Sequence, residues 1–146
     1  MYLAIDFGLK RIGLALGTMY PRGAGVLDGA KNIEIILSEL AQIVKENDVE
    51  AIVIGMPIRS AGEEGTIADK IRDFAEKLAK FTHLAVYFEP EQFSSAEAKR
   101  MLVENKKSHT REGGEVDEMS AVLILEQFLN QVERVGLNTI EPDYKP

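Results

Sequence analysis

The chain opens with two short apolar runs, residues 2–5 and 12–16, on either side of a polar insert that contains Gly8. Short apolar runs around a glycine-containing turn predict a β-hairpin. Residues 24–27 form a third short apolar stretch, which predicts an edge strand beside the hairpin. The N-terminal part of the chain is therefore expected to form antiparallel strands.

Beyond residue 30, the hydrophobic pattern alternates between helical and strand-like periods. Residues 31–47 carry apolar side chains at i, i+3, i+4 and i+7, which predicts an amphipathic helix. Residues 51–55 and 84–88 are continuous apolar runs, a pattern typical of strands buried on both faces of a sheet. Three further helices are expected, starting at Thr66, at Ser94 and near Val116, and Gly136 is placed to end the last one after Arg134.

An antiparallel start followed by strand–helix–strand units predicts an α/β fold with one mixed five-stranded sheet. The first three strands would be antiparallel and the others parallel, with helices on both faces. A chain of 146 residues suits one domain. We place this domain at residues 1–137 and expect a polar C-terminal tail at 138–146.

Composition limits the class of protein. The chain is 45% hydrophobic and 28% charged, which is ordinary for a soluble fold. It has no apolar span long enough for a membrane helix, no signal peptide and no cysteine, so we expect a cytoplasmic protein without a membrane partner. The net charge of −7 argues against tight, nonspecific binding to nucleic acid, although it is compatible with a local basic site.

Three carboxylates fall at corresponding places in this predicted fold. Asp6 follows the first strand, Glu91 lies just past the strand at 84–88, and Asp117 opens the last helix. Asp117 shares a helix face with apolar side chains at i+4, i+7 and i+11, which directs it toward the sheet. If that helix packs beside the first strand, the three acids converge, and their oxygen ligands suit Mg²⁺ or Mn²⁺.

Each acid also has a simpler explanation. Asp6 favours a turn beside a glycine, Asp117 complements the positive end of a helix dipole, and Glu91 is one of 24 acidic residues. From spacing alone, both interpretations stay open. Neither His83 nor His109 stands in a sequence context that supports histidine-based catalysis.

Four segments, in order along the chain, carry a family resemblance. The first runs from Asp6 to Ala15 and reads D-F-G-L-K-R-I-G-L-A. It is similar to the opening motif D-x-G-x-K-R-I-G-x-A of the YqgF/RuvX family. The other matching segments are Ile54-Gly55-Met56-Pro57 with Gly62, the run from Glu91 to Ala98, and the run from Val116 to Glu126. Together they cover nearly the whole predicted domain, and four ordered motifs are more specific than any one of them.

Members of this family are ribonuclease H-like proteins described as Holliday-junction resolvase-like or pre-16S rRNA-processing nucleases. The resemblance implies a ribonuclease H-like fold and a metal-dependent endonuclease that cuts phosphodiester bonds in precursor rRNA or branched DNA. It also implies that Asp6, Glu91 and Asp117 are the catalytic acids and hold Mg²⁺ or Mn²⁺. We expect a monomer or a homodimer, and the sequence does not choose between the RNA and the DNA substrate.

Positive side chains near the acids are candidates for nucleic-acid binding. Lys10 and Arg11 occupy the turn beside Asp6, where they are placed to contact a backbone phosphate. Charged residues in loops are often only solvated, so candidates in the predicted loops are weaker. These weaker candidates are Arg59, Lys106, Lys107 and Arg111.

The chain departs from the family pattern around Glu91 and Asp117. Pro90 and Gln92 stand where the family has an acid and an arginine, and Glu115 replaces a basic residue before the final V-D motif. These changes remove two positive contacts near the predicted site. An alternative function is therefore a nucleic-acid or ribosome-assembly binding module with weak catalysis.

Overall fold

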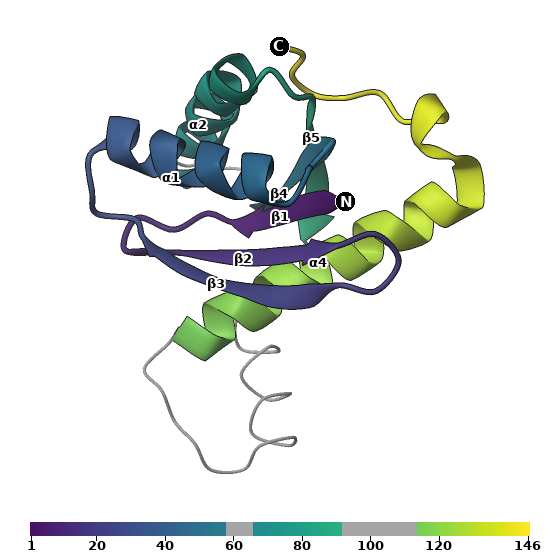
Figure 1. Cartoon of the computed structure of the whole chain (residues 1–146), viewed down its shortest axis with the longest axis horizontal. Coiled ribbons are helices and arrows are strands. Elements are labelled where there is room, and N and C mark those ends of the chain that lie inside the picture. Colours follow the sequence, from purple (N-terminus) through teal and green to yellow (C-terminus); the bar gives the residue numbers. More distant parts are fainter. Residues whose placement is uncertain (58–65, 92–113) are drawn as a thin grey trace.

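The computed structural model describes residues 1–57, 66–91 and 114–146, and these contain one five-stranded sheet (Figure 1). The strands are Tyr2–Asp6 (β1), Arg11–Gly17 (β2), Arg22–Asp28 (β3), Ala51–Pro57 (β4) and Val86–Glu91 (β5). Their spatial order is β3-β2-β1-β4-β5. The β1–β2 and β2–β3 pairs are antiparallel, whereas β1–β4 and β4–β5 are parallel. This arrangement confirms the predicted mixed sheet.

Helices cover both faces of the sheet (Figure 1). The helices Ile33–Glu46 (α1) and Thr66–Thr82 (α2) lie on one face, and the helix Gly114–Val135 (α4) crosses the other. The helix that we expected to start at Ser94 lies outside the described residues. Gly136 ends α4 with a positive φ of 85°, as predicted, and a short 3-10 helix, Leu137–Thr139 (η1), follows. Among the helices described, none is both long enough and apolar enough to cross a membrane.

Side chains alternate along each strand, so the sheet separates two apolar cores. Leu3 and Ile5 of β1 pack with α1 and α2, whereas Tyr2 and Ala4 pack with α4. Asp6 is the next residue in this alternation on the α4 face. β1 therefore ends with a carboxylate between the core under α4 and the solvent.

β5 lies later in the chain than the apolar pattern predicted. We expected a strand at 84–88 with Glu91 beyond it, but the parallel ladder with β4 continues to the pair Pro57↔Glu91. The prediction was wrong because Glu89 and Pro90 interrupt the apolar run, although Glu89 is a buried residue. Pro90 is tolerated because β5 is the outermost strand of the described sheet on this side. Glu91 thus stands on a strand end.

The residues after 137, which we expected to form a polar tail, return to the outer edge of β5. Tyr144 forms an antiparallel bridge with Val86, and its ring packs edge-on against Phe88 with centroids 5.8 Å apart. The N–H of Phe88 donates a hydrogen bond of 2.8 Å to Asp143 Oδ2. These contacts satisfy backbone groups that an uncovered edge strand would leave exposed.

The first turn of α4 lies directly on β2 at Gly13. A Cβ atom at Gly13 would collide with the backbone carbonyl of Asp117. The neighbouring positions on this face are also small, since Ala4 of β1 pairs with Ala15 of β2. These small residues set the distance between α4 and the sheet, and with it the position of Asp117.

We expect Gly13→Ala to destabilise the fold by about 1–3 kcal/mol, the usual cost of inserting a methyl group into a tightly packed contact. Thermal unfolding would show this change as a lower Tm. Gly23→Ala is the comparison variant, because its Cβ would meet the carboxylate end of Glu118 at 2.6 Å, which disturbs the hydrogen bond from Gly25 but leaves the helix backbone in place. Equal losses of Tm in both variants would contradict this packing constraint.

Candidate active site

The three acids singled out in the sequence lie on the α4 face of the sheet. Asp6 ends β1, Glu91 ends β5, and Asp117 lies in the first turn of α4. Asp6 pairs in register with Gly13, and Gly13 in turn lies against the backbone of Asp117. The topology therefore brings carboxylates from distant parts of the chain to one end of the sheet.

Asp6 lies in an environment that disfavours its negative charge. Burial, and then the charges of Glu91 and Asp117, raise the pKa of Asp6 from 3.8 to about 7. A hydrogen bond with the side chain of Ser120, which is itself buried, lowers this pKa and so opposes the shift. The carboxylates are thus close enough to repel one another, and a bound cation would relieve that repulsion.

Glu91 occupies space that Gly55 of β4 leaves free. A Cβ atom at Gly55 would lie 2.8 Å from Glu91 Oε2 and 2.5 Å from Ile124 Cδ1 of α4. Burial raises the pKa of Glu91, as it does for Asp6. The position of this carboxylate therefore depends on the absence of a side chain on the neighbouring strand.

Arg11 forms an ion pair with one of the three acids. Its Nε atom donates a hydrogen bond of 2.6 Å to Asp117 Oδ2. The two side chains are 48% and 20% exposed, so water screens the pair, and we assign it a stabilisation of roughly 0–1 kcal/mol. Its main effect is on the site itself, because it orients Asp117 and offsets one of the clustered negative charges.

The donor set of this cluster fits a divalent cation. Three carboxylates supply the hard oxygen ligands that Mg²⁺ and Mn²⁺ prefer, and the raised pKa of Asp6 reflects negative charge that a cation would offset. In the described ranges, however, no three His, Cys, Asp or Glu side chains lie close enough together to hold one ion. Asp117 Oδ2 already accepts the hydrogen bond from Arg11, which takes up part of its capacity to coordinate a cation. The assignment of a metal to Asp6, Glu91 and Asp117 stays a prediction.

Comparison with known proteins identifies the family. Residues 1–131 match the profile of the family described as "RuvX: Holliday junction resolvase". The chain belongs to the RuvX family. A protein of Koribacter versatilis named "Putative pre-16S rRNA nuclease" is 39% identical over 142 residues, which cover 96% of this chain and 91% of that protein. A protein of the same name from Endomicrobium trichonymphae is 34% identical over 131 residues, covering 88% and 94%. The resemblance inferred from four motifs is therefore confirmed.

The fold of this RuvX-family protein is also similar to that of solved resolvases. The structure of Thermus thermophilus RuvC in complex with a Holliday junction substrate matches with a TM-score of 0.59 and 14% identity, covering 97% of this chain and 99% of that one. A Fowlpox virus resolvase in complex with Holliday junction DNA matches with a TM-score of 0.51 and 8% identity, covering 88% and 99%. At such low identity the likeness concerns the fold alone, and it confirms the ribonuclease H-like architecture.

The predicted nucleic-acid contacts of this RuvX-family chain are described only in part. Lys10 is exposed beside Arg11 at the end of the sheet that carries Asp6. His83 is exposed as well. Positions that lie outside the described residues are Arg59, Gln92, Lys106, Lys107, His109 and Arg111. The proposed phosphate contacts therefore stay predictions.

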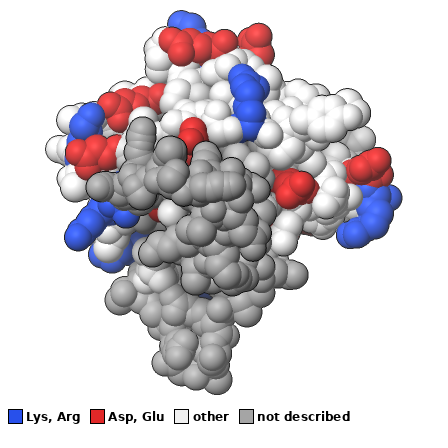
Figure 2. Space-filling view, turned by 90° about the horizontal axis from the view of Figure 1, so that it is seen from below, with Lys and Arg blue, Asp and Glu red and all other residues white. Residues whose placement is uncertain are grey.

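Positively and negatively charged side chains are mixed on the face seen in Figure 2. The described Lys and Arg side chains stand in separate small groups, and Asp and Glu side chains lie among them. In this view the described residues form no continuous basic surface, in keeping with the net charge of −7. The binding of a polyanion to this face would therefore depend on a few local contacts and on bound cations.

Two residues that support the site were missed as functional candidates in the sequence. The side chain of Ser120 forms a hydrogen bond with Asp6. The sequence feature that could have indicated this role is the i, i+3 spacing that places Ser120 on the same helix face as Asp117. Glu118 Oε2 accepts a hydrogen bond of 2.7 Å from the N–H of Gly25, which ties α4 to the edge strand β3. Glu118 had no comparable signal, because its partner is a backbone group of a strand far away in the sequence.

In the absence of divalent cations, which a chelator removes, the free energy of unfolding of Asp6→Asn should increase relative to that of the wild type as the pH rises. The folded-state pKa of Asp6, about 7, lies above its ordinary value of 3.8, so wild-type stability is lost as the pH rises through the folded pKa. Asparagine does not ionise, so the variant does not lose this stability. Between pH 4 and pH 8, the difference in free energy of unfolding should move by about 1–3 kcal/mol in favour of the variant.

Urea unfolding at a series of pH values measures this difference. Asp73→Asn is the control, because Asp73 is an exposed carboxylate of α2 that pairs with Lys77 at the helix surface. It should show a much smaller pH trend. A difference between Asp6→Asn and the wild type that does not change with pH would contradict the electrostatic coupling.

Proposed function

We propose that this protein is a metal-dependent endonuclease that hydrolyses phosphodiester bonds in precursor 16S rRNA. The observation that carries the proposal is the convergence of Asp6, Glu91 and Asp117 at one end of the sheet, where burial and then the charges of Glu91 and Asp117 raise the pKa of Asp6. The names of the similar bacterial proteins support the RNA substrate. The description of the family as a Holliday junction resolvase makes four-way DNA junctions the second substrate to test.

In this proposal, Asp6, Glu91 and Asp117 hold one or two Mg²⁺ or Mn²⁺ ions. When bound, such ions supply the Lewis acidity that activates water and stabilises the leaving oxygen of a phosphodiester. Asp6 ends the central strand of the sheet, so it anchors the site on rigid backbone. Glu91 and Asp117 complete the acidic cluster from the outer strand and the helix, and Ser120 orients the Asp6 carboxylate by its hydrogen bond.

Lys10 and Arg11 are proposed to position the substrate backbone. They stand at the start of β2, at the same end of the sheet as Asp6. The guanidinium of Arg11 lies 2.6 Å from Asp117, so a phosphate bound beside the acids would be within its reach. Arg11 would then exchange a carboxylate partner for a phosphate partner when the substrate binds.

A second candidate function is a nucleic-acid or ribosome-assembly binding module with weak catalysis. Arg11 engages Asp117 Oδ2, and no three acidic side chains of the described segments are close enough to share an ion. Pro90 also precedes Glu91 within β5, where the family pattern has an acid. These features favour weak metal binding. This candidate predicts RNA binding without cleavage.

A precursor rRNA substrate would place the protein in the bacterial cytoplasm, in keeping with the expectation from its composition. All three acids belong to one chain and to the proposed domain at residues 1–137. A monomer would therefore contain the complete acidic cluster, and a homodimer would contain two of them.

Cleavage should require both a divalent cation and the acidic cluster. We expect the purified protein to cut a precursor 16S rRNA fragment in Mg²⁺ or Mn²⁺ and to stop when a chelator is added. Asp6→Asn should lower the cleavage rate at least about 100-fold, because several kcal/mol of metal-dependent stabilisation would be lost. Asp73→Asn is the matched control with unchanged cleavage. A four-way DNA junction and an unstructured RNA, assayed in parallel, establish the preferred substrate.

Calorimetric titration with Mn²⁺ and an RNA-binding assay separate the two candidate functions. For a nuclease, the wild type binds Mn²⁺ and Asp6→Asn binds it more weakly. If both proteins bind RNA equally and neither cleaves any of the substrates, the nuclease proposal is wrong and the binding module is supported.

Lys10→Ala should weaken RNA binding to a similar degree for different sequences. Loss of one phosphate contact on a single strand reduces the slope of log K against log salt concentration by roughly 0.7. Fluorescence anisotropy at several salt concentrations measures this slope. Lys45→Ala, in the last turn of α1, is the control, because that turn leads into the start of β4, at the opposite end of the sheet from Asp6. Identical slopes for the wild type and Lys10→Ala would rule out this contact.

A further inference from the structure

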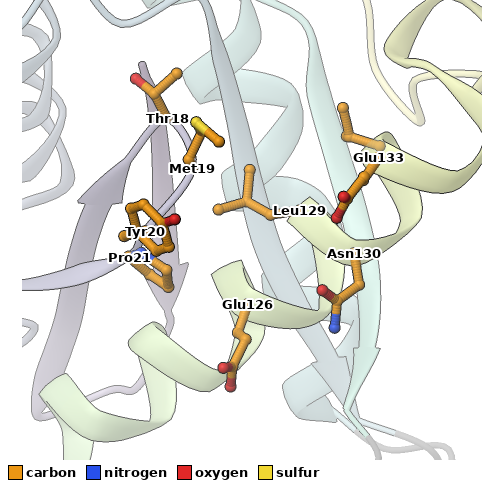
Figure 3. Close-up of a pocket in the computed structure, with 9 residues that line it drawn as sticks. Thr18, Met19, Tyr20, Pro21, Glu126, Leu129, Asn130 and Glu133 are labelled. Atoms are coloured by element: carbon orange, nitrogen blue, oxygen red, sulfur yellow. The ribbon is translucent and has the colours of Figure 1, made fainter.

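A groove lies between the β2–β3 turn and the second half of α4. We call it the turn–helix groove, and its volume is about 470 Å³. Figure 3 shows Met19 and Tyr20 on the turn side, Leu129 between the two walls, and Glu126 and Glu133 on the helix side. It therefore combines apolar and acidic side chains from segments far apart in the sequence.

The turn–helix groove is separate from the acidic cluster of the candidate active site. The turn follows Gly17, which pairs with Tyr2 at the start of β1, whereas Asp6 stands at the other end of that strand. On the helix side, Glu126 lies nine residues after Asp117, about 14 Å along the axis of α4. A ligand in the groove would not compete directly with a substrate at Asp6.

The turn presents two large apolar side chains to the solvent. Tyr20 is 81% exposed and Met19 is 69% exposed, whereas Leu129 beside them is only 9% exposed. The turn is tight, because a Cβ atom at Gly17 would lie 2.6 Å from the Tyr20 carbonyl oxygen. Aromatic and methionine side chains are enriched in binding surfaces. Their support on a short turn between two paired strands lowers the entropy lost when a partner binds.

The helix side of the groove carries negative charge. Glu126 and Glu133 are exposed and lie two helical turns apart on one side of α4, with Asn130 between them. Neither glutamate forms an ion pair with another residue of the described segments. Arg22 and Arg134 are close to the groove in sequence but do not line it. The groove therefore favours a cationic ligand.

These features favour a basic protein segment over a nucleic acid. Two carboxylates repel phosphate groups, so the groove opposes an RNA or DNA backbone. A guanidinium group suits it, because it stacks on a tyrosine ring and forms charge-assisted hydrogen bonds with carboxylates. The exposed apolar side chains would in turn pack against apolar neighbours of that arginine.

We propose that the turn–helix groove binds a segment of a protein partner in which an arginine is flanked by apolar residues. The arginine enters between Glu126 and Glu133 and stacks against Tyr20. Its apolar neighbours contact Met19 and Leu129. The site does not depend on the nuclease activity proposed above, so the two proposals fail or hold separately.

Nuclear magnetic resonance titration of the ¹⁵N-labelled full chain tests this site. The probe is a capped peptide with one arginine between two leucines, added to about 5 mM so that millimolar affinity is detected. Amide shifts are expected at residues 18–20 and 126–133. A peptide with citrulline in place of arginine keeps the shape without the charge, and it should bind at least about tenfold more weakly.

Two variants and a matched control locate the interaction. The double variant Glu126→Gln, Glu133→Gln and the single variant Tyr20→Ala should each weaken peptide binding, the former about tenfold. The substituted side chains are exposed, and the spectrum of each variant reports whether it is folded. Glu34→Gln is the control, because Glu34 is an exposed carboxylate on α1, which covers the opposite face of the sheet.

Several outcomes would overturn the proposal. Shifts confined to the residues around Asp6 and Asp117 would place the peptide at the acidic cluster instead. Equal binding of the arginine and citrulline peptides would remove the electrostatic basis of the site. The absence of any shift in the groove, or an RNA oligonucleotide that shifts the same amides more strongly, would show that the groove does not bind a basic protein segment.

Discussion

The close contact between α4 and the small-residue face of β1 and β2 is the constraint on which the candidate site depends. Gly13 has no Cβ, so the backbone of Asp117 lies directly on the sheet. Asp6 pairs with Gly13 in the antiparallel ladder, and this register brings the two acids to the same place. Gly55 makes a similar space for Glu91 on the other side of β1. The three carboxylates are thus positioned by backbone packing.

Packing has to hold these acids together because their charges oppose it. Burial and then the repulsion from Glu91 and Asp117 raise the pKa of Asp6 to about 7, and the Ser120 hydrogen bond opposes only part of this shift. The free energy comes from the two apolar cores on either side of the sheet. A cluster assembled at the expense of stability is typical of a functional site, where charge is arranged for a ligand.

The distribution of charge also separates two ends of the molecule. Lys10 and Arg11 lie beside the acids, where a phosphate and a cation would offset each other's charge. The turn–helix groove lies at the other end of β1 and carries two glutamates that oppose phosphate binding. A net charge of −7 is therefore compatible with a nuclease, because local arrangement decides where a polyanion can bind.

The sequence by itself determined most of the described strands and helices, and it placed two of the three acids, Asp6 and Asp117, at the ends of their elements. Apolar periodicity reflects which side of a strand or helix is buried, so it located the hairpin, the helices α1, α2 and α4, and the positions of Asp6 and Asp117 at element ends. It misplaced β5, because the buried Glu89 and the edge residue Pro90 do not look apolar. Only the tertiary structure revealed the Arg11–Asp117 ion pair, the Glu118–Gly25 hydrogen bond and the space beside Gly55 that Glu91 occupies. These contacts join segments far apart in the chain, and their geometry depends on strand register and on the distance between helix and sheet.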